Sequence, residues 1–257
     1  MPPTKHDIWP KPFLHSQTAP RLFSGLGEDT LQHILQNSFV KTFENGHILV
    51  QQGDKPEHLI FIISGTVKTL RADDEGKEAV IRLLQAGETC MEAVLFMGDA
   101  SPITVQTISE SKVLLIPEKL IKSLTMQNAQ FANNILHTVT HYYKNAMQQI
   151  DAMQIKSPLQ RIGYYFLLKH LEHGSDDFEF SIPFKKSIIA NYLGMTPETF
   201  SRCLQKMKAL GVETDDDIIR MKDAFSLCHF CDTDTEALCR RHNKDDCPHC
   251  PVSRPKT

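Results

Sequence analysis

Short hydrophobic runs separated by turns occupy the first half of the chain. Gly65, Gly76, Gly87 and Gly98 follow one another at intervals of 11 residues. The hydrophobic runs lie between or beside these turns and span residues 59–63, 66–71, 79–84, 103–107 and 112–116. Short strands with a turn about every ten residues are typical of a small antiparallel barrel or jelly roll. The pattern therefore predicts such a β-roll.

From Phe131 onward the hydrophobic period becomes that of a helix. Apolar residues recur every three or four positions, at Phe131, Ile135, Val139, Tyr142, Ala146, Ile150 and Met153. A continuous helix over this stretch would be about 35 Å long, and Ser157-Pro158 would end it. A helix of this length between two domains favours pairing with a second copy in a dimer. The alternative is that the stripe packs on its own β-roll.

The segment from Lys186 to Gly211 has the pattern of two helices joined by a tight turn. Gly194 supplies the turn, and Thr196 precedes Pro197 in the manner of an N-cap followed by the proline favoured at the first helical position. Such a pair of helices is the helix-turn-helix unit of DNA-binding proteins. Residues 212–221 then predict two short strands around an aspartate-rich turn, which form a wing.

The second helix of this unit has a polar face that suits contact with DNA. Arginine can bind guanine through two hydrogen bonds, and glutamate can accept one from cytosine. Between positions 181 and 210 there are five cations and one anion, a balance that suits phosphate contacts. The alternative is an ordinary helical hairpin with solvated charges. The predicted DNA-contacting residues are Thr196, Glu198, Ser201, Arg202, Gln205 and Lys206.

The end of the chain is rich in cysteine. Five of the seven cysteines fall within the last 30 residues, and four of them form a C-x2-C-x15-C-x2-C pattern. This spacing is typical of a four-thiolate zinc site, and the same thiolates could hold an iron–sulfur cluster. The third alternative is a thiol tail with no metal. The predicted ligands are Cys228, Cys231, Cys247 and Cys250, with Cys239 as an additional ligand nearby.

Several of these segments resemble the Crp/Fnr superfamily of bacterial transcription regulators, over about residues 20–223. The residues that carry the resemblance are Gly53-Asp54, Phe61 to Gly65 with Val67, Gly87-Glu88 and Pro197 to Arg202. Glu198, Ser201 and Arg202 match the base-reading positions of that family. Their Glu…Ser-Arg form is similar to the Fnr side of the superfamily, which implies a two-fold DNA site with TTGAT-like half-sites. The resemblance also implies RNA polymerase as a partner.

The resemblance implies an α+β fold: an N-terminal β-roll (jelly roll) like that of cyclic-nucleotide-binding domains, a long dimerisation helix and a C-terminal winged helix-turn-helix. Together with the sequence pattern it predicts five segments. These are an N-terminal extension (1–20), a β-roll sensor domain (21–125), a dimerisation helix (126–155), a winged helix-turn-helix DNA-binding domain (156–225) and a cysteine-rich tail (226–257).

The sensor domain departs from the pattern of the family's cyclic-nucleotide binders. Met91-Glu92 replaces their Gly-Glu pair, and Pro102 stands where their phosphate-binding arginine is expected. Residues 83–111 contain no lysine or arginine, so a buried phosphodiester would lack a counter-charge. Cyclic AMP is therefore not the expected effector.

The superfamily has two other kinds of effector site. Residues 91–97 resemble the nitric-oxide-responsive Dnr branch, and this resemblance makes haem in the β-roll a candidate cofactor. Haem is a weaker candidate than a metal site at the cysteine tail. No histidine, for example His47 or His58, is marked as a haem ligand by its spacing. The N-terminal cysteine cluster of oxygen-sensing Fnr proteins is absent, because no cysteine precedes Cys90.

Composition and charge fit a soluble, cytoplasmic protein with no membrane partner. The chain has 257 residues, 41% of them hydrophobic, and a formal net charge of −3. No hydrophobic run is long enough to cross a bilayer, and no secretory signal is apparent. No catalytic constellation occurs, so an enzyme is not expected. The prediction is a homodimeric DNA-binding regulator that responds to a redox or gas signal, such as nitric oxide. The alternative is a metal-binding redox or interaction module in which DNA binding is secondary.

Overall fold

The computed structural model describes residues 3–9, 19–173, 178–223, 226–232 and 235. The chain divides into two compact units, residues 1–147 and 148–257. Helix α6 (Ala129–Ile155) begins in the first unit and ends in the second.

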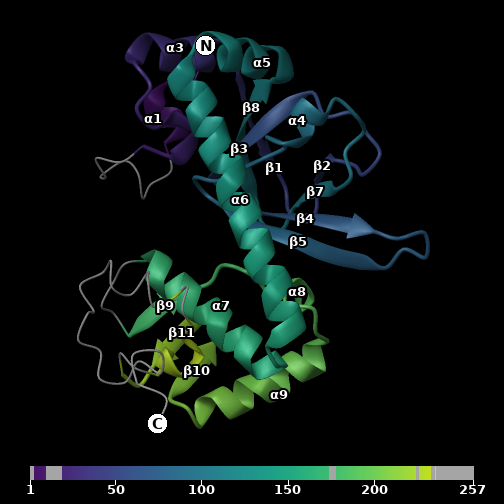
Figure 1. Ribbon diagram of the computed structural model, residues 1–257, viewed down its shortest axis with the longest axis vertical. Helices are drawn as coiled ribbons and strands as arrows, with labels where there is room; N and C mark the ends of the chain where they lie inside the picture. Colours follow the sequence, from purple (N-terminus) through teal and green to yellow (C-terminus); the bar gives the residue numbers. More distant parts are fainter. Residues whose placement is uncertain (1–2, 10–18, 174–177, 224–225, 233–234, 236–257) are drawn as a thin grey trace. The chain divides into compact units, whose positions relative to one another are not determined.

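Two four-stranded antiparallel sheets form a β-roll in the first unit (Figure 1). One sheet has the strand order β1-β8-β3-β6 and the other β2-β7-β4-β5. The strands are β1 (Phe39–Phe43), β2 (Ile48–Val50), β3 (His58–Ser64), β4 (Thr66–Ala72), β5 (Glu78–Gln85), β6 (Thr89–Cys90), β7 (Thr104–Thr107) and β8 (Ser111–Pro117). All five predicted runs are strands, and the predicted fold class is confirmed. The sequence did not reveal β1, β2 and β6, which are short or largely unburied.

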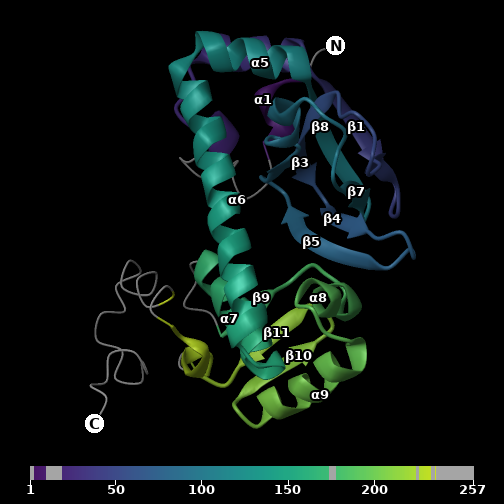
Figure 2. The ribbon, with the colours of Figure 1, turned by 45° about the vertical axis from the view of Figure 1, so that its right-hand side comes forward.

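The core of the β-roll is built on β3, whose residues 59–63 are all buried. Short helices gather at one end of the roll, around the start of α6 (Figures 1 and 2). They are α1 (Lys5–Ile8), η1 (Arg21–Phe23), α3 (Glu28–Gln36) and α5 (Glu118–Gln127), while α4 (Val94–Met97) follows β6. Within the predicted N-terminal extension, described residues contribute to this core, because Ile8 is fully buried and Trp9 stacks on Phe23, 5.3 Å between ring centroids.

A buried polar cluster fixes α6 to the β-roll. The Tyr142 hydroxyl of α6 donates to the Thr89 carbonyl (3.0 Å) and accepts from the Thr89 N–H (3.2 Å). The Arg82 guanidinium lies 3.4 Å above the Tyr142 ring and also donates to the Thr89 carbonyl (2.7 Å). Its Nη1 is 3.4 Å from the buried Glu92 carboxylate. Burial raises the pKa of Glu92, and the charge of Arg82 opposes that rise.

The apolar stripe predicted along α6 divides into two parts. Phe131 and Ile135 belong to the core of the β-roll, so the first part packs on its own domain. The stripe residues near the C-terminal end of α6 are exposed, including Ile150 at 45%. A second apolar set, made up of Leu136, Tyr143 and Met147, lies exposed on the helix and continues to Ile150, which the predicted stripe also contains. The sequence could not separate these two sets, because both repeat with a helical period.

The described residues of the second unit include the end of α6, three further helices and three strands. The further helices are α7 (Pro158–His173), α8 (Lys186–Tyr192) and α9 (Pro197–Lys208), with a 3-10 turn η2 (Cys228–Phe230). Strands β9 (Glu179–Ser181), β10 (Val212–Asp215) and β11 (Ile218–Met221) form an antiparallel sheet in the order β10-β11-β9. Helix α7 packs against α9, and fully buried Phe166 and Phe200 are among the residues of this core.

No helix in the described part of the chain combines the length and apolar character needed to cross a membrane.

The contact between Tyr142 and Thr89 is testable by a change of one hydroxyl. We expect Tyr142→Phe to lower the free energy of unfolding by about 1–3 kcal/mol, because the buried Thr89 N–H loses its hydrogen-bond partner. The matched control is Thr42→Val, which removes an exposed hydroxyl from β1, and for which we expect a change within about 0.5 kcal/mol. Urea unfolding of both variants measures the difference. Equal effects would contradict the assigned role of Tyr142.

Candidate nucleic-acid interface

Helices α8 and α9 form the predicted helix-turn-helix. Gly194 has φ = 65°, a left-handed conformation that favours glycine, and it turns the chain between the helices. The Thr196 hydroxyl accepts from the Thr199 N–H (3.3 Å), so Thr196 caps α9, with Pro197 at its first position. Ala190 of α8 is fully buried. The turn, the cap and the proline thus lie where the sequence predicts them.

Side chains from α6 and α7 donate hydrogen bonds to the backbone of the turn between α8 and α9. Arg161 Nη1 donates to the carbonyl of Leu193 (2.8 Å), and Gln149 Nε2 donates to that of Tyr192 (2.9 Å). A Cβ atom on Gly194 would lie 3.3 Å from Arg161 Nη1, so the arginine packs directly on the turn. Arg161 and Gln149 are more than 30 residues away in the sequence, and no local pattern marks them. Their role was therefore missed by sequence analysis.

Helix α9 separates a buried face from an exposed one. Phe200, Cys203 and Met207 are buried. The six predicted DNA-contacting residues are all exposed and run from the N-cap of α9 to its last turn. They are Thr196, Glu198, Ser201, Arg202, Gln205 and Lys206. The structure thus brings the whole predicted set onto one accessible surface.

Polar contacts position Glu198 and Arg202 on the first turns of α9. The N–H of Glu198 and the hydroxyl of Thr196 lower the pKa of Glu198, with a further contribution from the charge of Arg202, so its carboxylate stays ionised at neutral pH. Arg202 Nη2 donates to the Thr199 hydroxyl (3.3 Å), and most of its guanidinium donors remain available. An acceptor and a cation therefore stand side by side at the helix N-terminus, where base edges are read in helix-turn-helix proteins.

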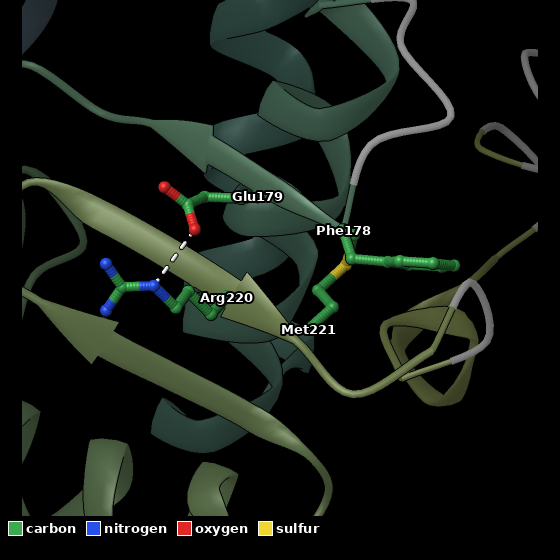
Figure 3. Close-up of a pocket in the computed structure, with 4 residues that line it drawn as sticks. All are labelled: Phe178, Glu179, Arg220 and Met221. Carbon is green, nitrogen blue, oxygen red and sulfur yellow. Dashed lines mark hydrogen bonds and ion pairs between the residues drawn. The ribbon is translucent and has the colours of Figure 1, made fainter.

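The wing is the hairpin β10–β11 with β9 at its side. Arg220 of β11 bridges the sheet, since it pairs with Glu179 of β9 (2.9 Å) and Asp215 of β10 (2.9 Å), as Figure 3 shows for Glu179. The hydrogen bond to Asp215, followed by the hydrogen bond and the charge of Glu179, raises the pKa of Arg220. Arg220 lines a surface pocket together with Phe178, Glu179 and Met221. Because its charge is balanced within the sheet, Arg220 serves the wing's structure.

Cations surround the exposed face of α9. Lys185 and Lys186 are exposed at the start of α8, and Lys206 and Lys208 are exposed in the last turn of α9. Lys208 is 3.5 Å from Glu213 in an exposed pair, which contributes little to stability. These side chains suit contact with phosphates, which position a protein on DNA without reading its sequence.

The cysteine tail is only partly within the described residues. Cys228 begins the turn η2 and Cys231 follows it; both are half-buried, and the Cys231 N–H donates to the Cys228 carbonyl (3.1 Å). The other predicted ligands, Cys239, Cys247 and Cys250, lie outside the described residues. Within those residues, no three metal-binding side chains come together. The donor chemistry of the visible pair, two thiols on one tight turn, fits half of a four-thiolate site.

His47 and His58 were the example histidines in the prediction about haem. The imidazole of His47 is exposed and stacks on Phe43, with 4.6 Å between ring centroids. His58 is half-buried at the start of β3.

Two parts of the chain match known protein families. Residues 40–128 match the family described as "Cyclic nucleotide-binding domain", and residues 160–230 match the "Crp-like helix-turn-helix domain". Together the two ranges cover more than half of the chain.

Curated relatives cover most of the chain. The "Fumarate and nitrate reduction regulatory protein" of Vibrio cholerae is 27% identical over 192 residues, which are 72% of this chain and 75% of the relative. The "Anaerobic regulatory protein" of Pasteurella multocida is 26% identical over 72% of this chain and 67% of the relative. The "Transcriptional activator protein FnrA" of Stutzerimonas stutzeri is 22% identical over 78% and 82%, respectively.

Solved structures share the same architecture. FixK2 from Bradyrhizobium japonicum has a TM-score of 0.68 at 16% identity, covering 76% of this chain and 98% of FixK2. A CooA mutant from Carboxydothermus hydrogenoformans has a TM-score of 0.67 at 17% identity, covering 84% and 96%. At these identities the likeness concerns the fold alone.

Proposed function

Because the chain belongs to the Crp/Fnr family of DNA-binding transcription regulators, which are not enzymes, we propose that it acts as a homodimer whose two α9 helices read TTGAT-like half-sites. The observation that carries this proposal is the exposed polar face of α9, where Glu198, Ser201 and Arg202 stand together at a capped helix N-terminus. RNA polymerase is the proposed protein partner, on the basis of the family resemblance.

The dimer forms through the exposed apolar residues of α6. Leu136, Tyr143 and Ile150 recur every seven residues, and Met147 lies on the same side. A seven-residue repeat of apolar side chains is what a second helix needs in order to pack along the first. Leu136 and Tyr143 are each 63% exposed in the single chain, so a second copy of α6 is the occupant that would cover them.

The proposed signal is a redox or gas signal. The names of the relatives, which refer to anaerobic regulation and to fumarate and nitrate reduction, support this class of signal. Cyclic AMP is not the proposed effector. Arg82, the cation nearest to the segment that lacks lysine and arginine, is already engaged by Glu92, Tyr142 and the Thr89 carbonyl. A buried phosphate there would meet the Glu92 carboxylate without a spare counter-charge.

The cysteine tail is the proposed metal site. Cys228, Cys231, Cys247 and Cys250 supply four thiolates with the spacing of a zinc or iron–sulfur site. Zinc would fix the tail, whereas an iron–sulfur cluster would add redox chemistry.

The proposed domain boundaries are those predicted from the sequence, at residues 20, 125, 155 and 225.

The reading face is tested by Arg202→Ala. We expect the affinity for a duplex with two TTGAT-like half-sites to fall by about 30-fold or more, because each half-site loses an arginine–base contact that contributes about 1–3 kcal/mol. The affinity for an unrelated duplex should change far less. Arg71→Ala, at an exposed arginine of β4, is the matched control and should bind as the parent does. If a folded Arg202→Ala protein gives the same DNA footprint as the parent, the assignment of this face of α9 to base reading is contradicted.

The dimer face is tested by Tyr143→Glu. A buried charge in the helix pair is costly, so we expect sedimentation to show a shift from dimer to monomer. Met126→Glu, at a residue of α5 that is 86% exposed, introduces the same charge away from this face and should leave the dimer intact. A Tyr143→Glu protein that remains dimeric would show that α6 pairs elsewhere.

A further inference from the structure

Glu198 and Arg202 stand at a spacing that favours their pairing with each other. They are four residues apart on α9, with the acid ahead of the cation, which is the better order for an ion pair on a helix surface. Such a pair would occupy the two groups that are expected to read bases. Both residues lie in the described part of the chain, where each makes its hydrogen bond to a threonine.

Thr199 holds the side chain of Arg202. The two residues are three positions apart, so they lie on the same side of the helix. Arg202 Nη2 donates to the Thr199 hydroxyl (3.3 Å). Thr199 is half-buried and Arg202 is exposed, so a fixed hydroxyl supports a side chain that extends into solvent. An arginine has five N–H donors, and the remaining ones suit the two acceptors of a guanine.

Thr196 holds the carboxylate of Glu198. Hydrogen bonds from the Glu198 N–H and from the Thr196 hydroxyl lower the pKa of Glu198, and the charge of Arg202 adds a smaller effect. The Thr196 hydroxyl is placed by the helix cap, since it accepts from the Thr199 N–H (3.3 Å) and lies 3.2 Å from the Thr199 hydroxyl. The two threonines thus form one unit, in which one binds the acid and the other binds the cation.

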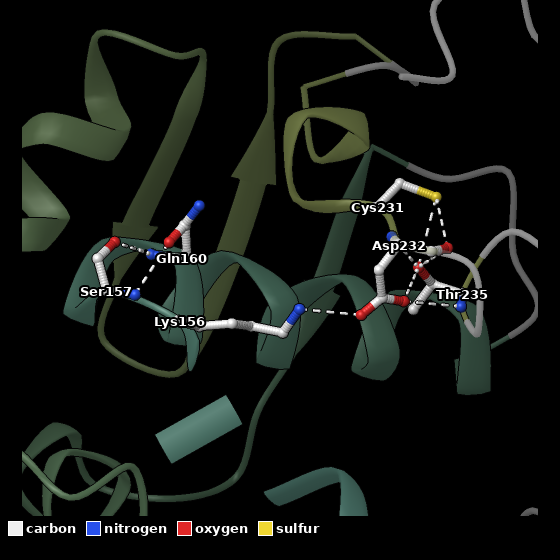
Figure 4. Close-up of polar contacts among 6 residues, drawn as sticks. All are labelled: Lys156, Ser157, Gln160, Cys231, Asp232 and Thr235. Carbon is white, nitrogen blue, oxygen red and sulfur yellow. Dashed lines mark hydrogen bonds and ion pairs between the residues drawn. The ribbon is translucent and has the colours of Figure 1, made fainter. Parts of the chain in front are cut away.

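The start of α7 shows what another residue does at the position of Thr199. There the Ser157 N–H donates to Gln160 Oε1 (2.9 Å) and the Gln160 N–H donates to Ser157 Oγ (3.4 Å), so the third residue of the helix caps it reciprocally (Figure 4). In α9 the third residue is Thr199, whose shorter side chain contacts the Thr196 hydroxyl. A hydroxyl oxygen has two acceptor sites, and Arg202 uses one of them.

We propose that Thr199 is a positioning residue for DNA recognition, whose hydroxyl keeps the Arg202 guanidinium away from the Glu198 carboxylate so that both can reach bases. The proposal rests on the proposed function. Without the hydroxyl, Arg202 is free to pair with Glu198. Arg202 must then leave that pair and lose side-chain freedom when it binds a base, and both costs lower the affinity. Thr199 therefore acts on DNA binding through Arg202.

The experiment compares full-length variants on a duplex with two TTGAT-like half-sites and on an unrelated duplex. Thr199→Val removes the hydroxyl and keeps the shape of the side chain. We expect its affinity for the TTGAT-type duplex to fall about fivefold or more, because the arginines of both half-sites lose their support, and its affinity for the unrelated duplex to change less than about twofold. Thr199→Ser, which keeps a hydroxyl, should restore the affinity. Thr42→Val, the same substitution at an exposed position of β1, should bind as the parent does.

The same substitution in an Arg202→Ala protein separates positioning from direct contact with DNA. If Thr199 acts through Arg202, Thr199→Val should change the affinity of the Arg202→Ala protein by less than about twofold. A hydroxyl that itself contacts a phosphate would instead be missed on both duplexes, with or without Arg202. That result would overturn the proposal, as would a Thr199→Val protein that binds the TTGAT-type duplex as tightly as the parent.

A second measurement needs no DNA. In Thr199→Val the guanidinium comes closer to Glu198, so we expect the pKa of Glu198 to fall below its value in the parent. Carbon-13 NMR titration of labelled glutamate carboxylates measures this change, with the Glu198 signal assigned from Glu198→Gln. Thr199→Ser and Thr42→Val should leave the pKa of Glu198 at the parent value. An unchanged pKa of Glu198 in Thr199→Val would overturn the proposal.

The two measurements also separate this proposal from the proposed function. A parent that shows no preference for the TTGAT-type duplex would refute the proposed function. The pKa of Glu198 would still report whether Thr199 keeps Arg202 apart from the acid.

Discussion

The hydrogen bonds that Arg161 and Gln149 make to the backbone between α8 and α9 are the constraint on which the rest of the DNA-binding unit depends. A recognition helix discriminates bases only if its side chains are held in a fixed place. The turn before α9 is short, and Gly194 gives it a left-handed conformation with little stiffness of its own. Arg161 satisfies the carbonyl of Leu193, and Gln149 that of Tyr192. The direction of α9 is therefore set by α6 and α7.

In the proposed function, a signal elsewhere in the chain would change DNA binding through α6. Helix α6 is bound to the β-roll through Tyr142, and its last turns carry Gln149. Two readers of a two-fold site must stand about 34 Å apart to meet successive major grooves. A small rotation of the helices changes that spacing, and a signal needs only a few kcal/mol of preference between two arrangements to act. The buried Arg82–Glu92 pair lies beside Tyr142, at the contact between α6 and the β-roll.

The parts of the structure that follow from local pattern could be predicted from the sequence. The alternating runs gave the main strands, and the threonine and proline at 196 and 197 located the start of α9. The family resemblance rested on these same segments. The DNA-contacting side chains could be proposed because their exposure follows from helical periodicity. Their tertiary supports could not be predicted, because those contacts join residues far apart in the chain.

Ile8 shows the same limit, since nothing in its surroundings marks it as part of the β-roll core. In α6, the periodicity indicated one stripe where the fold uses two, because burial against the β-roll depends on which side the roll occupies.

The direct test of the central claim is selection of binding sequences from a random DNA library by the full-length protein. The account predicts enrichment of a two-fold symmetric sequence with TTGAT-like half-sites whose centres are about one helical turn apart. Enrichment of no common sequence, or of a single unpaired half-site, would contradict it.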